Sequence, residues 1–109
     1  MEAFYFIEKA IELAEENKGL NVICESNNSI GFRYISDIKS ITDKYGKSIV
    51  LVIGSEPNNI YSFLNLFCIE YNKLGRCDVQ LLSEDGSHYL DVKDVGIFEK
   101  YGNKYYIIK

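Results

Sequence analysis

His88 is the only histidine in the chain, and Asp85, Ser87 and Asp91 lie within three residues of it. A histidine beside a carboxylate is a common arrangement for general acid–base catalysis. The alternation expected of a strand over 87–92 argues against that role, because it points His88 and Asp91 to opposite faces. Asp85 is occupied in the turn that it forms with the following glycine. We therefore interpret His88 as a half-exposed structural residue and predict no catalytic residue.

The cysteines Cys24, Cys68 and Cys77 are the other candidate nucleophiles and metal ligands. An odd number without a C-x-x-C pair is typical neither of a disulfide framework nor of a zinc site. Cys24 falls on the apolar face of an expected strand and Cys68 on the apolar stripe of an expected helix, whereas the role of Cys77 stays open. We predict no metal, no cofactor, and three free thiols in a reducing cytoplasm.

The loop at 54–57 follows an apolar strand expected over 48–53 and precedes a helix expected over 57–74. Ligands often bind beyond the carboxyl end of such a strand, and a helix N-terminus attracts anions. Ser55, Asn58 and Asn59 could donate hydrogen bonds there. Against this, the loop lacks a nucleotide-binding glycine motif, and Glu56 would repel a phosphate. A small-ligand or anion sensor, or an enzyme that uses this loop, is therefore the alternative function; the simpler interpretation is that Ser55 caps the helix.

Four glutamates, Glu8, Glu12, Glu15 and Glu16, cluster on the polar face of a helix expected over 2–18. Like charges one turn apart destabilise a helix by roughly 0.2–0.5 kcal/mol per pair, and Glu15 and Glu16 lie near the negative end of the helix dipole. Repeated local conflict without local compensation can mark a functional surface. A basic partner protein would supply the compensation. The alternatives are a solvated face that keeps the protein soluble, or lysines brought close by the fold.

Tyr101, Tyr105 and Tyr106 gather in the hairpin expected over 95–108. Tyrosine is enriched at protein interfaces, so we add these three residues to the predicted protein-binding surface. The final strand is also a candidate sheet edge that could pair with a partner or with a second copy. A self-assembling structural subunit, with a homo-oligomer as its product, is therefore a further alternative.

The hydrophobic spacing predicts the elements that position these residues. Two long helices, over 2–18 and 57–74, repeat apolar residues at i, i+3 and i+4. In the first helix the apolar stripe consists of Ala3, Phe6, Ile7, Ala10, Ile11, Leu13 and Ala14. A short helix is expected over 36–45, where Ile38, Ile41 and Tyr45 share a face. Alternation and turn residues predict strands over 20–25, 30–35, 48–53, 77–83, 87–92, 95–100 and 104–108.

These elements define the predicted fold class, which is α+β. We expect a single domain over 1–109 with a mixed, mostly antiparallel sheet, helices on its faces, and one βαβ crossover between the strands at 48–53 and 77–83. Two longer helices and one short helix complete it. The order of the strands in the sheet does not follow from the sequence pattern.

Composition excludes several classes of protein. The chain has 109 residues, 47% apolar and 26% charged, which suits one globular domain. The net charge is −4 and Arg33 and Arg76 are the only arginines, so we expect no nucleic-acid partner. The longest aliphatic run, 49–53, is too short for a bilayer, and the acidic N-terminus is unlike a secretory signal. Abundant Ile, Lys, Asn and Tyr indicate an AT-rich genome, such as that of a bacterium, an archaeon or a mobile element.

The leading prediction is therefore a small, acidic, cytoplasmic, non-enzymatic domain that binds a protein with a basic surface. Inhibitors, immunity proteins and adaptors are proteins of this type.

Overall fold

The structure is a computed structural model that describes residues 1–25 and 32–109. Within them the chain forms two helices and seven strands. In chain order these are α1 (Ala3–Glu16), β1 (Val22–Glu25), β2 (Phe32–Asp43), β3 (Gly46–Gly54), α2 (Ile60–Leu74), β4 (Asp78–Leu82), β5 (Tyr89–Asp91), β6 (Val95–Lys100) and β7 (Asn103–Ile108).

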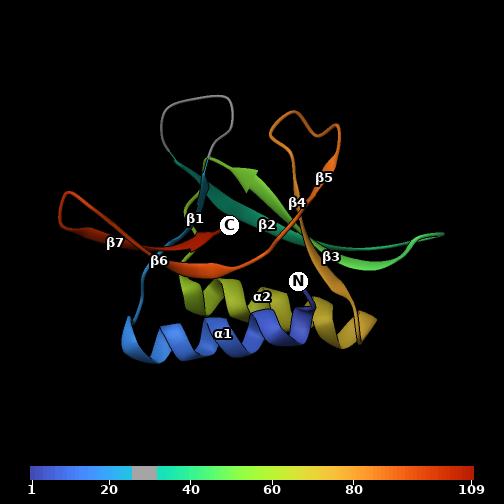
Figure 1. Ribbon diagram of the computed structural model, residues 1–109, viewed down its shortest axis with the longest axis horizontal. Helices are drawn as coiled ribbons and strands as arrows, with labels where there is room; N and C mark the ends of the chain where they lie inside the picture. The colour runs from blue at the N-terminus through green and yellow to red at the C-terminus, as the bar shows by residue number, and fades with distance from the viewer. Residues whose placement is uncertain (26–31) are drawn as a thin grey trace.

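The strands form one mixed sheet in the order β5-β4-β3-β2-β1-β7-β6. The pairs β1–β7 and β3–β4 are parallel, and the other neighbouring pairs are antiparallel. The parallel pair β3–β4 is joined through α2. The sheet curls into a half-barrel, and both helices lie together along one side of it (Figure 1). The C-terminal strand thus lies beside the first strand of the chain.

A single apolar core fills the space between the helices and the inner face of the sheet. Three phenylalanines lie at its centre, where the ring of Phe6 in α1 is 4.8 Å from that of Phe67 and 5.9 Å from that of Phe63 in α2. All three are fully buried. Burying a phenylalanine side chain contributes roughly 1.5–3 kcal/mol, so this contact fixes the two helices to each other and to the sheet.

The predicted fold class is wrong. No third helix is present in the described residues, because the segment expected as a short helix over 36–45 is the second half of β2 and the turn into β3. The sheet is also not an open layer with helices on its faces, since it curls and holds both helices on one side. Ile38 is buried as expected of a core residue, but Tyr45 is 84% exposed in the turn.

β2 contains a β-bulge, but the bulge precedes the residues on which the helix prediction rested. The β2–β3 register shifts between Ile35 and Asp37, which leaves Ser36 as the extra residue. After the bulge the register is continuous, with Ile38 opposite Leu51 and Ile41 opposite Ser48. Ile38 and Ile41 therefore point to opposite faces of a regular strand, and their spacing of three, which is also typical of a helix, led to the wrong prediction.

Candidate functional site

Helix α1 presents the predicted acidic surface. Small or apolar side chains at Ala3, Phe6, Ala10 and Ala14 are buried against the core, at the spacing of one helix face. The backbone N–H of Ala3 donates to the carbonyl of Cys77 at 2.8 Å, which ties the first turn to the chain entering β4. The opposite face of the helix is therefore held in a fixed orientation toward solvent.

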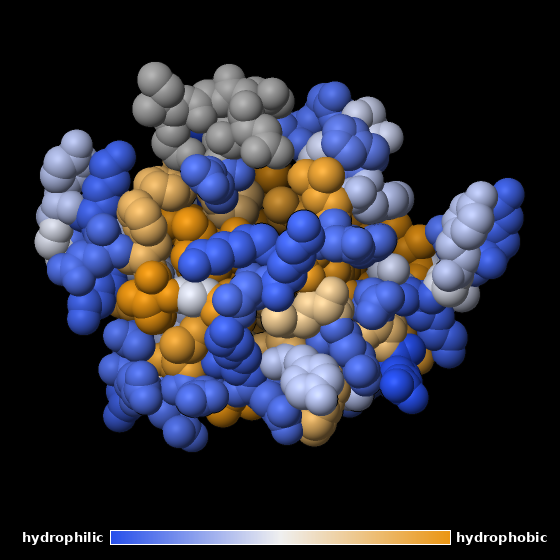
Figure 2. All heavy atoms as spheres, in the orientation of Figure 1, coloured by the Kyte–Doolittle hydropathy of each residue, from blue (hydrophilic) through white to orange (hydrophobic). Residues whose placement is uncertain are grey.

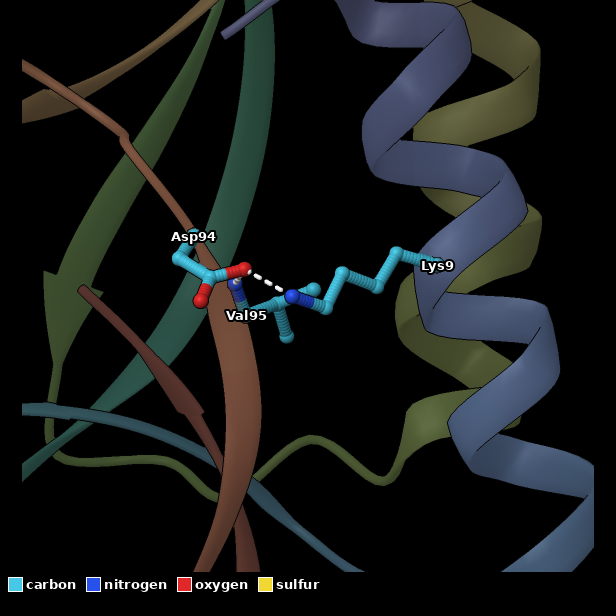
Figure 3. A network of polar contacts seen from close by, with 3 residues as sticks. All are labelled: Lys9, Asp94 and Val95. Atoms are coloured by element: carbon cyan, nitrogen blue, oxygen red, sulfur yellow. Dashed lines mark hydrogen bonds and ion pairs between the residues drawn. The ribbon is translucent and has the colours of Figure 1, made fainter.

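A second tie is an ion pair between α1 and the sheet. The Lys9 ammonium reaches the Asp94 carboxylate just before β6, and the same carboxylate accepts a hydrogen bond from the Val95 N–H at 2.9 Å (Figure 3). The Lys9 hydrogen bond holds the pKa of Asp94 below its usual value. Lys9 is thus engaged with the sheet and does not neutralise the glutamates around it.

The four predicted glutamates, Glu8, Glu12, Glu15 and Glu16, are all exposed on this outward side. The ion pairs seen in residues 1–25 and 32–109 involve other carboxylates, and residues 26–31 contain no basic side chain. The last turn of α1 also carries no basic residue. Within the described chain no ion pair therefore joins these four glutamates to a lysine or arginine.

Large apolar side chains lie between these carboxylates. Phe4 is 50% exposed, Tyr5 64% and Ile11 45%. The helical spacing predicted Ile11 on the buried stripe, but the buried residues of α1 are Ala3, Phe6, Ala10 and Ala14. We define the α1 outer face by its four glutamates and these three residues: Phe4, Tyr5, Glu8, Ile11, Glu12, Glu15 and Glu16.

One edge of the α1 outer face borders a groove of about 440 Å³. Tyr5, Glu8 and Glu12 lie on its helix side, and Lys93 and Asp94 lie on its sheet side. Helix α2 adds exposed apolar side chains on the same side of the molecule, with Ile69 at 45%. In Figure 2 apolar surface is visible between the hydrophilic side chains of the face on which α1 lies in front. The α1 outer face therefore combines negative charge and apolar area with a groove along one edge.

The predicted tyrosines do not form one surface. Tyr106 is fully buried, and its hydroxyl donates to the carbonyls of Leu13 and Asn17 at the end of α1. Burial raises the pKa of Tyr106 to about 12. We therefore correct its assignment, because a residue inside the core cannot contact a partner. Tyr101, at 91% exposure, and Tyr105 instead line a hollow on the other side of the sheet.

The predicted ligand loop is largely occupied by its own contacts. The Asn59 side chain accepts hydrogen bonds from the backbone N–H groups of Tyr61 and Ser62, both at 3.0 Å, and so caps α2. Asn59, rather than Ser55, is therefore the capping residue. The carbonyl of Asn58 accepts from the Val22 N–H at 2.9 Å. Ser55 lines a hollow of about 530 Å³.

The remaining reactive side chains show no catalytic arrangement in the described residues. All three cysteines are free, and burial raises the pKa of Cys24 to about 11 and shifts the pKa of Cys77 upward. An upward shift of the pKa disfavours the thiolate, which is the nucleophilic form of cysteine. No group of three potential metal ligands occurs in residues 1–25 and 32–109.

His88 belongs to a polar turn. Its Nδ1 atom is 2.8 Å from the Ser87 hydroxyl oxygen, and the Ser87 hydroxyl also lies 2.7 Å from Asp85. Hydrogen bonds from Ser83 and Ser87 hold the pKa of Asp85 well below its usual value. The serine thus stands between the histidine and the aspartate, an order unlike that of a catalytic triad, in which the histidine is central.

Neither helix, in the described part of the chain, is long and apolar enough to cross a membrane. Comparison with known proteins yields no match to a family model, to a curated protein or to a solved structure.

Proposed function

We propose that the protein is a non-enzymatic binding domain of the inhibitor, immunity or adaptor type, which docks the α1 outer face onto a basic surface of a partner protein. One observation carries the proposal. Four glutamates without an ion partner in the described chain alternate with half-exposed apolar side chains on a single, firmly anchored helix.

The physical argument concerns what each component contributes to binding. Exposed apolar area supplies affinity when it is buried, because it leaves water. The carboxylates supply attraction to a basic partner and exclude acidic ones. A partner lysine or arginine in the groove beside Tyr5 would also meet an aromatic ring together with the carboxylates of Glu8 and Glu12. We place this protein in the cytoplasm, in keeping with its three free cysteines.

The test is affinity capture from the native host at low and moderate salt, with mass spectrometry of the retained proteins. A variant carrying Glu8→Lys, Glu12→Lys, Glu15→Lys and Glu16→Lys is compared with one carrying Glu25→Lys, Glu56→Lys, Asp91→Lys and Glu99→Lys. All eight positions are exposed, and both variants have the same net charge. We expect the wild type and the second variant to retain a basic protein at low salt and to release it at moderate salt. The first variant should not retain that protein at either salt concentration.

Loss of the partner with both variants would mean that net charge alone drives capture, and retention by both would remove the α1 outer face from the interaction. Recovery of the bait alone would contradict the proposal.

A second candidate function is a small-ligand or anion sensor at the loop after β3. It is favoured by the hollow of about 530 Å³ lined by Ile53, Gly54 and Ser55, with the Arg33–Glu84 ion pair on its wall. An increase in the melting temperature with inorganic phosphate that disappears in Ser55→Ala would support it. No increase up to millimolar phosphate would contradict it.

A further inference from the structure

The side of the sheet away from the helices carries a second, smaller apolar cluster. Ile23 and Ile107 are neighbours in the β1–β7 register and are only 2% and 6% exposed, yet neither belongs to the main core. Their chain neighbours Val22, Cys24 and Ile108 do belong to it. Because successive side chains of a strand point to opposite faces, Ile23 and Ile107 lie on the far face of the sheet.

Aromatic side chains surround this cluster. Tyr34 is paired with Ile23 across β1 and β2, and Tyr105 is paired with Phe98 across β6 and β7. The rings of Phe32 and Phe98 are 4.7 Å apart. Strands from both ends of the chain thus contribute rings to one patch, because β7 lies beside β1 in the sheet.

The rings enclose a hollow of about 230 Å³. A cavity of roughly 150 Å³ holds a benzene-sized ligand, and sites for drug-sized ligands are roughly 300–1,000 Å³. The hollow therefore has room for a single flat ring system rather than for an extended cofactor. We call it the aromatic hollow, and it is lined by Ile23, Phe32, Arg33, Tyr34, Lys100, Tyr101, Asn103 and Tyr105.

Lys100 places a positive charge at the aromatic hollow. Its ammonium lies 5.6 Å from the ring centre of Phe32 and 5.3 Å from that of Tyr101. No ion pair within the described chain involves Lys100, and residues 26–31 contain no acidic side chain. Two rings therefore hold the cation in place without neutralising it. Arg33 also lines the hollow, but it forms an ion pair with Glu84 at 3.8 Å, so Lys100 supplies the positive charge.

We propose that the aromatic hollow binds a small molecule that combines one flat aromatic ring system with an anionic group, the chemistry of a nucleoside monophosphate. The ring lies against Tyr34, Tyr105 and the Ile23 floor, and the anionic group meets Lys100. The proposal specifies a small molecule because a nucleic-acid strand requires a row of phosphate-binding cations. Of the described residues that line the aromatic hollow, Lys100 is the one cation without an ion pair, because Arg33 is paired with Glu84, and the net charge of the chain is −4.

The experiment is a titration of the ¹⁵N-labelled protein with uridine monophosphate, followed by the backbone amide signals. Uridine, inorganic phosphate and a twelve-residue oligouridylate are titrated in parallel. We expect the monophosphate to shift the amides of Ile23, Lys100 and Tyr105, uridine to shift them at about tenfold higher concentration, and phosphate alone to leave them unchanged.

Three variants assign the contacts. Lys100→Gln should weaken monophosphate binding about tenfold and leave uridine binding unchanged, because it removes the charge and keeps much of the aliphatic stem. Tyr105→Leu should weaken binding of both ligands about tenfold, because it removes a stacking ring. Lys104→Ala is the matched control, since Lys104 is exposed in the same hairpin but does not line the aromatic hollow, and its affinity should equal that of the wild type.

The proposal fails if millimolar monophosphate shifts none of these amides in the wild type, which requires no variant to fold. It also fails if phosphate alone binds as well as the monophosphate, since the rings would then contribute nothing. The oligouridylate has twelve nucleotides, so it can bind up to twelve times more tightly than the monophosphate for statistical reasons alone. A larger gain in affinity would assign the aromatic hollow to a nucleic-acid strand and overturn the small-molecule proposal.

Discussion

The α1 outer face and the aromatic hollow both expose aromatic side chains, but they differ in charge and in shape. The α1 outer face lies along one helix and carries four glutamates, whereas the aromatic hollow is concave and carries the unpaired cation Lys100. The net charge of the chain, −4, has the same sign as the α1 outer face and the opposite sign to Lys100 in the aromatic hollow. A sum over the chain thus conceals a local positive site, because electrostatic recognition depends on charges within roughly a Debye length, about 10 Å at 0.1 M salt.

The two regions also differ in how the chain builds them. The α1 outer face comes from one continuous segment, so all its residues follow from a single helical repeat. The aromatic hollow combines side chains from β1, β2, β6 and β7. A disturbance of the shared core should therefore break both regions, whereas a surface substitution should affect only one.

The largest expected effect is that of Phe6→Ala, which should destabilise the protein by about 3–5 kcal/mol. Phe6 is fully buried and touches both Phe63 and Phe67, so its loss leaves a cavity where α1 meets α2. Urea denaturation measures the effect. Phe4→Ala is the matched control on the same helix: Phe4 is 50% exposed, and its truncation should cost less than about 1 kcal/mol. Equal effects of the two substitutions would show that α1 is not anchored by its inner face.

An intermediate effect is expected at Tyr106. This residue connects β7, one of the strands that build the aromatic hollow, to the end of α1. Tyr106→Phe removes the hydroxyl that donates to Leu13 and Asn17 and should cost about 1–2 kcal/mol. Tyr101→Phe, at a side chain 91% exposed, should change stability by less than about 0.5 kcal/mol.

The same pair of variants makes a prediction about pH. The folded pKa of Tyr106, about 12, lies above the ordinary value of 10, so its contribution to stability is complete below pH 10. It is lost as the pH rises from 10 to 12, because the unfolded chain ionises first. The free energy of unfolding should fall less steeply over this range in Tyr106→Phe than in Tyr101→Phe. Identical slopes would show that the Tyr106 hydroxyl is not buried.

The smallest effect concerns the α1 outer face itself and has the opposite sign. Glu12 lies one turn from both Glu8 and Glu16, so Glu12→Lys replaces two repulsive pairs by attractive ones and should stabilise the protein by about 0.5–1 kcal/mol at low salt. Glu12→Gln should give about half of this gain, and high salt should reduce both. The substitution should weaken partner binding while it raises stability. A loss of stability would show that Glu12 is already compensated.

Local pattern was informative where one element decides the outcome. The helical spacing of Phe6, Ala10 and Ala14 predicted α1, and the apolar run at 49–53 predicted β3, which is buried between β2 and β4. The acidic cluster on α1 also follows from its sequence spacing. The pattern failed over 36–45, where Ile38 and Ile41 point to opposite faces of β2 at a spacing that also suits a helix, and at Ile11, which is 45% exposed.

The sequence by itself determined the two long helices, the acidic side of α1 and the turn glycines, because each depends on residues within one or two turns of chain. Only the tertiary structure decided that β1 lies beside β7, that Tyr106 is buried while Tyr105 faces the aromatic hollow, and that Phe32 and Lys100 come together. Strand pairing between distant segments is set by contacts across the sheet. The hydrophobic pattern of one strand therefore does not identify the strand that pairs with it.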